Sequence, residues 1–244
     1  MISFKSTLLN ATLAVTVAIP LATAGLFTSA ESAQAAALSG AVQFVGGTTY
    51  SPFATSSTIE LSQDALTFTP QPITPIAITT GSATGNFSAF NSANIGNIIS
   101  FSSEKADNPF LDFGSLAAFG FATPGTIFPG ADTSSLTDGL NTFILKSATR
   151  SIIQSGLNVG IDVALFGVFT SATGETSNGG GNLTFQVNNA TVESVNSILS
   201  SGGSIKNLSF SGGVFATVPE PATLLGLGAV GAVMVMSHRR KSVI

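Results

Sequence analysis

The feature that most constrains the fold of this chain is an alternation of apolar and polar side chains with a period of two residues. The segment VGIDVALFGVFT places five apolar side chains on one face: Val159, Ile161, Val163, Leu165 and Phe169. The segment NLTFQVNN repeats the pattern with Leu183, Phe185 and Val187. Successive side chains of a β-strand point to opposite faces, so both segments are predicted to be strands that bury one face.

Shorter strand candidates surround these two segments: GAVQFVG, TIELS, ALTF, IAITT, GNFSAF, NIISF, TFILKS and IKNLSFSGGVFAT. Clusters of Gly, Pro, Ser and Asn separate them, and we expect turns at Pro70 to Pro75 and at Gly174 to Gly181, and a bulge or a turn at Gly212-Gly213. Many short strands with regular turns predict an all-β fold, a single antiparallel sandwich or jelly-roll-like domain. A solenoid is the alternative, although no fixed repeat period is visible. We expect a short helix near residues 191–200, whereas residues 108–121 are ambiguous.

Charge is scarce in this chain. Of 244 residues only 8% are charged, whereas 44% are hydrophobic, so the chain can form a packed core. Residues 36–217 are predicted to be one all-β extracellular domain, with ten acidic and four basic residues and a net charge of −6. Because nucleic-acid binding needs a basic surface, this composition argues against a nucleic-acid partner. The chain has no Cys, which excludes a disulfide framework.

Residues 1–35 have the pattern of a cleaved secretory signal peptide. Lys5 gives a positive start, and the next 25 residues carry no charge and include a long apolar run. Ala33 and Ala35 supply the small residues that signal peptidase reads, so we expect cleavage after Ala35, with Ala37 as the second choice. An uncleaved N-terminal membrane helix is the alternative.

The opposite end, residues 218–244, combines an apolar run with a basic tail. We expect a transmembrane helix over 222–238, because its uncharged core of 15 residues rises about 22 Å. That length is short for a hydrocarbon core of about 30 Å. The basic residues Arg239, Arg240 and Lys241 should anchor the tail on the cytoplasmic side. The body would then lie outside, in a single-pass inner-membrane precursor.

Before the apolar run stands the stretch Val218, Pro219, Glu220 and Pro221, whose prolines favour an extended, accessible chain. VPEP, an apolar helix and HRRK in this order resemble the PEP-CTERM sorting signal of bacteria, over residues 218–241. The resemblance implies that the membrane enzyme exosortase cuts near the triplet and that the body reaches the cell surface or the medium. It also implies a link to exopolysaccharide or biofilm. A tail anchor with a proline hinge is the alternative.

The body offers few groups for catalysis. It contains neither His nor Cys, which removes histidine triads, cysteine nucleophiles and ordinary zinc sites, so we expect no cofactor and no metal centre. Its carboxylates gather beside turn residues and could serve a glycosidase or bind calcium, but we expect them to solvate loops. The candidates are Glu104, Asp107, Asp112, Asp132 and Asp138. Asp162 interrupts an apolar strand and would need Arg150 or Lys146 as a partner if it were buried. The glycine run at 179–181 lacks the Lys-Ser/Thr of a P-loop, so we expect a flexible turn.

Sugar binding usually relies on Trp and Tyr, which combine an apolar face with a polar group. The body has no Trp, one Tyr (Tyr50) and 17 Phe, so we expect the phenylalanines to fill the core. The first hypothesis is therefore an exported, non-catalytic surface or extracellular-matrix protein associated with exopolysaccharide or biofilm. The alternative is a secreted carbohydrate-binding or carbohydrate-active enzyme domain.

Overall fold

The computed structural model describes residues 37–49, 55–79, 81–101, 108–117, 126–128 and 130–217. The described part is mostly β-structure, which confirms the all-β prediction. Its one α-helix, α2 (Val192–Ser200), lies where a short helix was predicted. Thr191 caps this helix by accepting a hydrogen bond from the Ser194 amide at 3.1 Å, and the Ser194 hydroxyl accepts one from the Thr191 amide.

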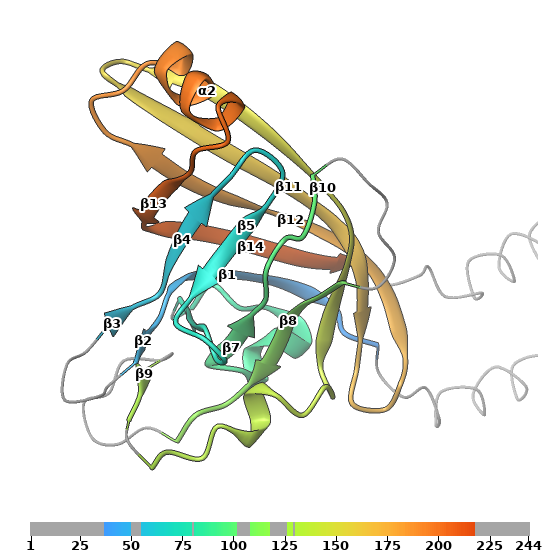
Figure 1. Cartoon of the computed structure of the whole chain (residues 1–244). Coiled ribbons are helices and arrows are strands. Elements are labelled where there is room, and N and C mark those ends of the chain that lie inside the picture. The colour runs from blue at the N-terminus through green and yellow to red at the C-terminus, as the bar shows by residue number, and fades with distance from the viewer. Residues whose placement is uncertain are drawn as a thin grey trace, which may run out of the picture. The chain divides into compact units, whose positions relative to one another are not determined.

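Eight antiparallel strands close into a barrel (Figure 1). In their order around the barrel they are β1 (Gly40–Gly46), β14 (Phe210–Thr217), β12 (Thr176–Val187), β11 (Asn158–Thr170), β10 (Thr142–Ser155), β8 (Asn108–Gly114), β7 (Ser92–Ile95) and β6 (Pro75–Ile78). The barrel closes because β1 pairs with β14 on one side and with β6 on the other.

The closed barrel corrects the prediction of a sandwich or jelly roll. Period-two alternation shows which side chains each strand buries, but it does not show which strands pair. Here the first long strand of the described chain pairs with the last, so β1 and β14 lie side by side (Figure 1). This pairing removes the two free edges that an open sheet would have.

Two small sheets accompany the barrel. One contains β13 (Ile205–Leu208), β4 (Thr58–Leu61) and β5 (Leu66–Thr69). The other contains β3 (Thr55–Ser56), β2 (Thr48–Thr49) and β9 (Thr126–Ile127). Two 3-10 turns, η1 (Gly85–Ala89) and η2 (Ser134–Leu136), complete the elements.

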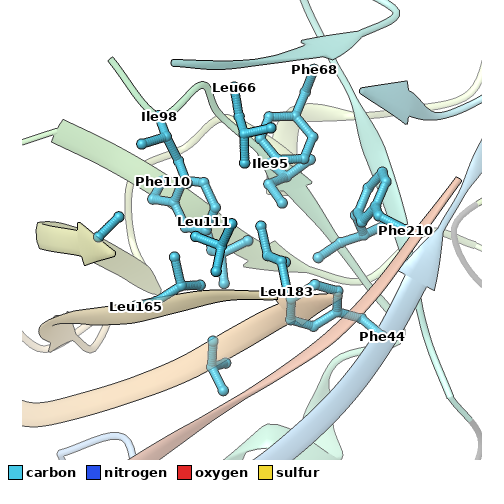
Figure 2. Packing of buried hydrophobic residues seen from close by; sticks show 14 of the residues in the cluster. Phe44, Leu66, Phe68, Ile95, Ile98, Phe110, Leu111, Leu165, Leu183 and Phe210 are labelled. Carbon is cyan, nitrogen blue, oxygen red and sulfur yellow. The ribbon is translucent and has the colours of Figure 1, made fainter. Parts of the chain in front are cut away.

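Phenylalanine fills the interior of the barrel. Phe44, Leu183 and Phe210 from the barrel strands meet Leu66 and Phe68 from β5 in one core (Figure 2). The Phe68 ring lies edge-on to Phe210, with their centroids 5.2 Å apart. The five apolar residues predicted to share one face of residues 159–170 are all fully buried, which confirms the alternation. The interior of the barrel is therefore packed with side chains.

Several glycine segments differ from their predicted turns. Gly179 to Gly181 lie inside β12, and Gly212-Gly213 lie inside β14, so neither run is a turn. A Cβ built on Gly181 would lie 2.2 Å from the Gly213 carbonyl oxygen, and one on Gly179 would lie 2.3 Å from the Phe169 ring. The glycines are therefore needed for close strand packing rather than for flexibility.

In three further segments the observed secondary structure differs from the prediction or settles an ambiguous one. GNFSAF, expected as a strand, contains η1 because Gly85 has a φ of +59°, and its ideal Cβ would meet the Ser39 carbonyl oxygen. NIISF contributes only an isolated bridge between Ile98 and Leu66. The ambiguous stretch 108–121 begins with strand β8, and its residues 118–121 lie outside the described residues.

Candidate functional site

The loop carboxylates predicted as candidate site residues are only partly brought together. Asp112, on β8, accepts a hydrogen bond from the Gly139 amide through Oδ2 at 2.9 Å, while its Oδ1 is buried and has no partner among the described residues. Burial raises the pKa of Asp112, and the nearby charge of Asp138 raises it further, although the Gly139 hydrogen bond opposes both effects. Asp138 itself accepts from the Leu140 amide.

The other carboxylates stand apart from this pair. Asp132 accepts from the Ser134 amide at 2.9 Å, and the hydroxyl and amide of Ser134 lower its pKa. Glu104 and Asp107 lie outside the described residues. Within the described part of the chain, no three His, Cys, Asp or Glu residues lie close enough to hold a metal ion together.

Asp162 is exposed on the outer face of β11, so it needs no buried partner. Arg150, the basic residue considered as its partner, instead donates to the carbonyl oxygens of Ser62 and Gln63, both at 3.0 Å. The Arg150 guanidinium also lies 5.2 Å from the centre of the Phe101 ring. The hydrogen bonds of Arg150 therefore hold the loop after β4 against the barrel, and Arg150 has no part in a site at Asp162.

The outer face of β11, β12, β14 and β1 carries an aromatic pair. In the strand register Phe166 lies opposite Gly180, and Gly180 lies opposite Phe215. Phe166 is 54% exposed and Phe215 is 50% exposed, although both lie on regular strands. A Cβ built on Gly180 would lie 3.5 Å from the Phe215 ring and 3.7 Å from the Phe166 ring, so the two phenyl rings cover this glycine from either side.

Polar side chains form the next rows of the same face. Gln43, Gly213 and Asn182 are register partners on β1, β14 and β12, so the amides of Gln43 and Asn182 stand on either side of a residue with no side chain. One row further, the hydroxyls of Thr184 and Ser211 share a hydrogen bond of 3.1 Å. The side-chain amides of Gln43 and Asn182 have no protein partner among the described residues, and both side chains are exposed.

Two hollows lie along these rows. The first has a volume of about 610 Å³, and its lining includes Gln43, Asn182 and Phe215. The second has a volume of about 510 Å³, and its lining includes Asp162 and Gln186. Thr184 and Ser211 line both hollows, so the two form one groove, which we call the outer groove.

Sequence reasoning missed the outer groove because it assigned the phenylalanines to the core. A signal was present, since Phe166 falls out of phase with the buried residues Leu165 and Phe169 in its strand. The second part of that signal is Gly180, a glycine at an outward position of the neighbouring strand. This glycine can be recognised as the neighbour of Phe166 only once the register of β11 with β12 is known.

The described residues form an all-β barrel whose outer groove is shallow and has one ionisable side chain, Asp162, in its lining. Beyond the barrel, residues 217–241 match the family model of the PEP-CTERM protein-sorting motif. This match confirms the resemblance seen in VPEP, the apolar run and HRRK. The motif indicates an exported protein that exosortase processes from a membrane-anchored precursor. No curated protein and no solved structure matches the chain.

The remaining sorting residues lie outside the described residues: Ala33, Ala35, Val218, Pro219, Glu220, Pro221, Arg239, Arg240 and Lys241. The same is true of the predicted signal segment 1–35 and of the predicted transmembrane helix 222–238. Within the part of the chain that the structure describes, no helix combines the length and the apolar character required to cross a membrane.

Proposed function

We propose that this protein is a non-catalytic component of the cell surface or extracellular matrix, delivered through exosortase and associated with exopolysaccharide. The sorting motif, which starts at the last residue of β14, carries the proposal. Thr217 is still paired with Asn178 in the barrel, and its hydroxyl donates to the Asn178 carbonyl oxygen at 2.9 Å. The last described strand of the barrel therefore reaches the first residue of the sorting motif.

The non-catalytic part of the proposal is supported by the surroundings of Asp112, the carboxylate with the raised pKa. A general acid or nucleophile must present an oxygen to its substrate. In Asp112 one oxygen is buried and the other already accepts the Gly139 amide, an arrangement that suits a structural carboxylate better than a general acid or a nucleophile. Asp162 is open to solvent on a strand.

The sorting route is tested by the mass of the processed protein recovered from the cell-surface fraction. We expect a species that has lost both predicted signals and retains the barrel up to Thr217, because a cut inside β14 would remove a strand from the middle of the sheet. A surface species that still contains Met1 or Arg239 contradicts the proposal. Replacing Pro219, Glu220 and Pro221 with alanines should hold the body at the membrane.

The association with polysaccharide is tested by retardation of the processed protein in gels cast with the producer's own exopolysaccharide. Retardation that persists at high ionic strength is the expected result, because the body has few charges to screen. Release of reducing sugar that stops in Asp112→Asn or Asp138→Asn would overturn the non-catalytic assignment. Wild-type protein that migrates unretarded at every salt concentration would overturn the association.

A further inference from the structure

We infer that the outer groove is a binding track for an uncharged polysaccharide chain. The inference rests on the proposed association with exopolysaccharide and assigns that association to one face of the barrel. Most of its lining comes from β1, β14, β12 and β11, four strands that are neighbours in the closed sheet.

The length of the groove suits a chain rather than a single sugar. Its two hollows follow β14 from Phe215 to Phe210, reach Ser209 just before the strand, and share Thr184 and Ser211 at their junction. From Ser209 to Phe215 an extended chain makes six steps of about 3.3 Å, which span about 20 Å. A surface of that length can contact several sugar rings in succession.

The charge of the groove selects an uncharged polymer. Among the residues that line the two hollows, Asp162 is the only ionisable side chain, and no Lys, Arg or His is present. A polyanionic chain would find no cation to pair with there and would meet the net negative charge of the body. Recognition must therefore rely on neutral hydrogen bonds and apolar contact.

The side chains of the groove suit both parts of a sugar ring, its apolar C–H face and its hydroxyl groups. The half-exposed ring of Phe215, which lines the groove, offers apolar surface for the C–H face of a pyranose. The ring of Phe166, on the far side of Gly180, adds exposed apolar surface beside the groove. The side-chain amides of Gln43, Asn182 and Gln186 have no hydrogen-bond partner within the described part of the chain, and each supplies donors and an acceptor, which sugar hydroxyls can satisfy in either role. The polar group that phenylalanine lacks is thus provided by the amides of the adjoining rows.

The paired backbone of these strands disfavours a peptide as the occupant. An extended peptide binds a sheet by adding a strand to a free edge. Each of β1, β14, β12 and β11 already has a hydrogen-bonded neighbour on both sides. The groove lies on the face of the sheet, where side chains alone can recognise a ligand.

The test compares processed proteins purified from the cell surface, by retardation in gels that contain the producer's exopolysaccharide, dextran or alginate. Phe215→Ala removes apolar contact, and Asn182→Ala removes a free amide without breaking any hydrogen bond in the described part of the chain. The matched controls are Leu157→Ala, which removes an apolar side chain that is 80% exposed, and Asn188→Ala, which removes an exposed amide outside the groove.

We expect each groove variant to weaken binding to the producer's polysaccharide by about fivefold to tenfold. The controls should bind like the wild type, and alginate should retard none of the proteins. Circular dichroism establishes that each variant is folded, and Asn182→Ala decides the question if Phe215→Ala destabilises the barrel.

The two claims fail in different ways. Groove variants that bind as tightly as a retarded wild type would overturn the groove assignment and leave the association with exopolysaccharide standing. A wild type that no polysaccharide retards would overturn both. A wild type that is instead a dimer, and that Phe215→Ala converts to a monomer, would show that the groove is an interface between two copies of this chain. Retardation by alginate and not by the producer's polymer would contradict the uncharged ligand.

Discussion

At the scale of single residues, two neighbours in β12 test the assignment of its faces. Phe185 is 6% exposed and points into the core, whereas Gln186 is exposed. Phe185→Asp would bury an unpaired charge and should cost more than about 4 kcal/mol, enough to prevent folding. Gln186→Asp should fold normally. Far-ultraviolet circular dichroism and thermal unfolding measure both, and equal losses in the two variants would contradict the face assignment.

Asp112 and Asp132 should respond to pH in opposite directions. The pKa of Asp112 is raised in the folded protein, so ionisation of this group opposes folding, and its contribution to stability falls as pH rises above the ordinary carboxyl range near about 4. Asp112→Asn keeps an acceptor for the Gly139 amide and should raise the melting temperature at pH 7. The gain should shrink as the pH is lowered through that range.

For Asp132 the effect of ionisation on stability has the opposite sign, because hydrogen bonds from Ser134 lower its pKa. Asp132→Asn should therefore lower the melting temperature at pH 7, by less at acidic pH, where the wild-type carboxylate also becomes protonated. Melting curves of both variants and the wild type between pH 3 and pH 7 measure these effects. A shift that is the same at every pH would mean that ionisation is not its cause.

Burial of individual side chains was predictable wherever the alternation was strict. Val163 and Leu183 face the core because a period of two fixes the side of every residue once one side is apolar. The exposed rings of Phe166 and Phe215 were not predictable in this way. Hydrophobicity alone favours their burial, and their actual position depends on Gly180, which belongs to a strand paired with both.

At the scale of strands, two glycines in similar settings should respond differently to the same change. An ideal Cβ on Gly181 would lie 2.2 Å from the Gly213 carbonyl oxygen and 2.6 Å from a methyl group of Val214. Gly181→Ala must push β12 and β14 apart and should cost about 1–3 kcal/mol. On Gly160 the nearest atom would be 3.8 Å away, so Gly160→Ala should change stability by less than about 1 kcal/mol.

Denaturant unfolding of both alanine variants measures this difference. A Gly181→Ala protein as stable as the wild type would show that the two strands approach less closely than the structure indicates. A loss in Gly160→Ala as large as that in Gly181→Ala would point to a general intolerance of side chains in these strands, and not to the contact with Gly213.

Elements defined by local signals were predicted, whereas those defined by distant partners were not. Helix α2 follows from Thr191 and the residues just after it, since its cap is formed within one turn. The glycine run in β12 resembles a turn when it is read alone. It is a strand because β11 and β14 pair with it along its whole length, and those partners lie 12 to 37 residues away in the sequence.

At the scale of the whole molecule, closure of the barrel joins the beginning and the end of the described chain. Gly40 on β1 is paired with Ala216 on β14, and the Ser177 hydroxyl on β12 donates to the Leu38 carbonyl oxygen at 2.7 Å. Pairings between such distant segments cannot form until the last strand has been made. They also explain why strand counting predicted the all-β class and not the barrel.

Removing β14 should therefore unfold the whole body. Without Phe210–Thr217, both β1 and β12 lose a neighbour, and the core loses the buried side chains of Phe210 and Val214. We expect a chain of residues 37–217 to give a β-type circular dichroism spectrum, resist limited proteolysis and unfold in one cooperative transition. A chain of residues 37–209 should show none of these properties, because the barrel would be open at two unpaired edges. A helix-dominated spectrum for the longer chain would contradict the fold, and equal protease resistance of the two chains would contradict the role assigned to β14 in closing it.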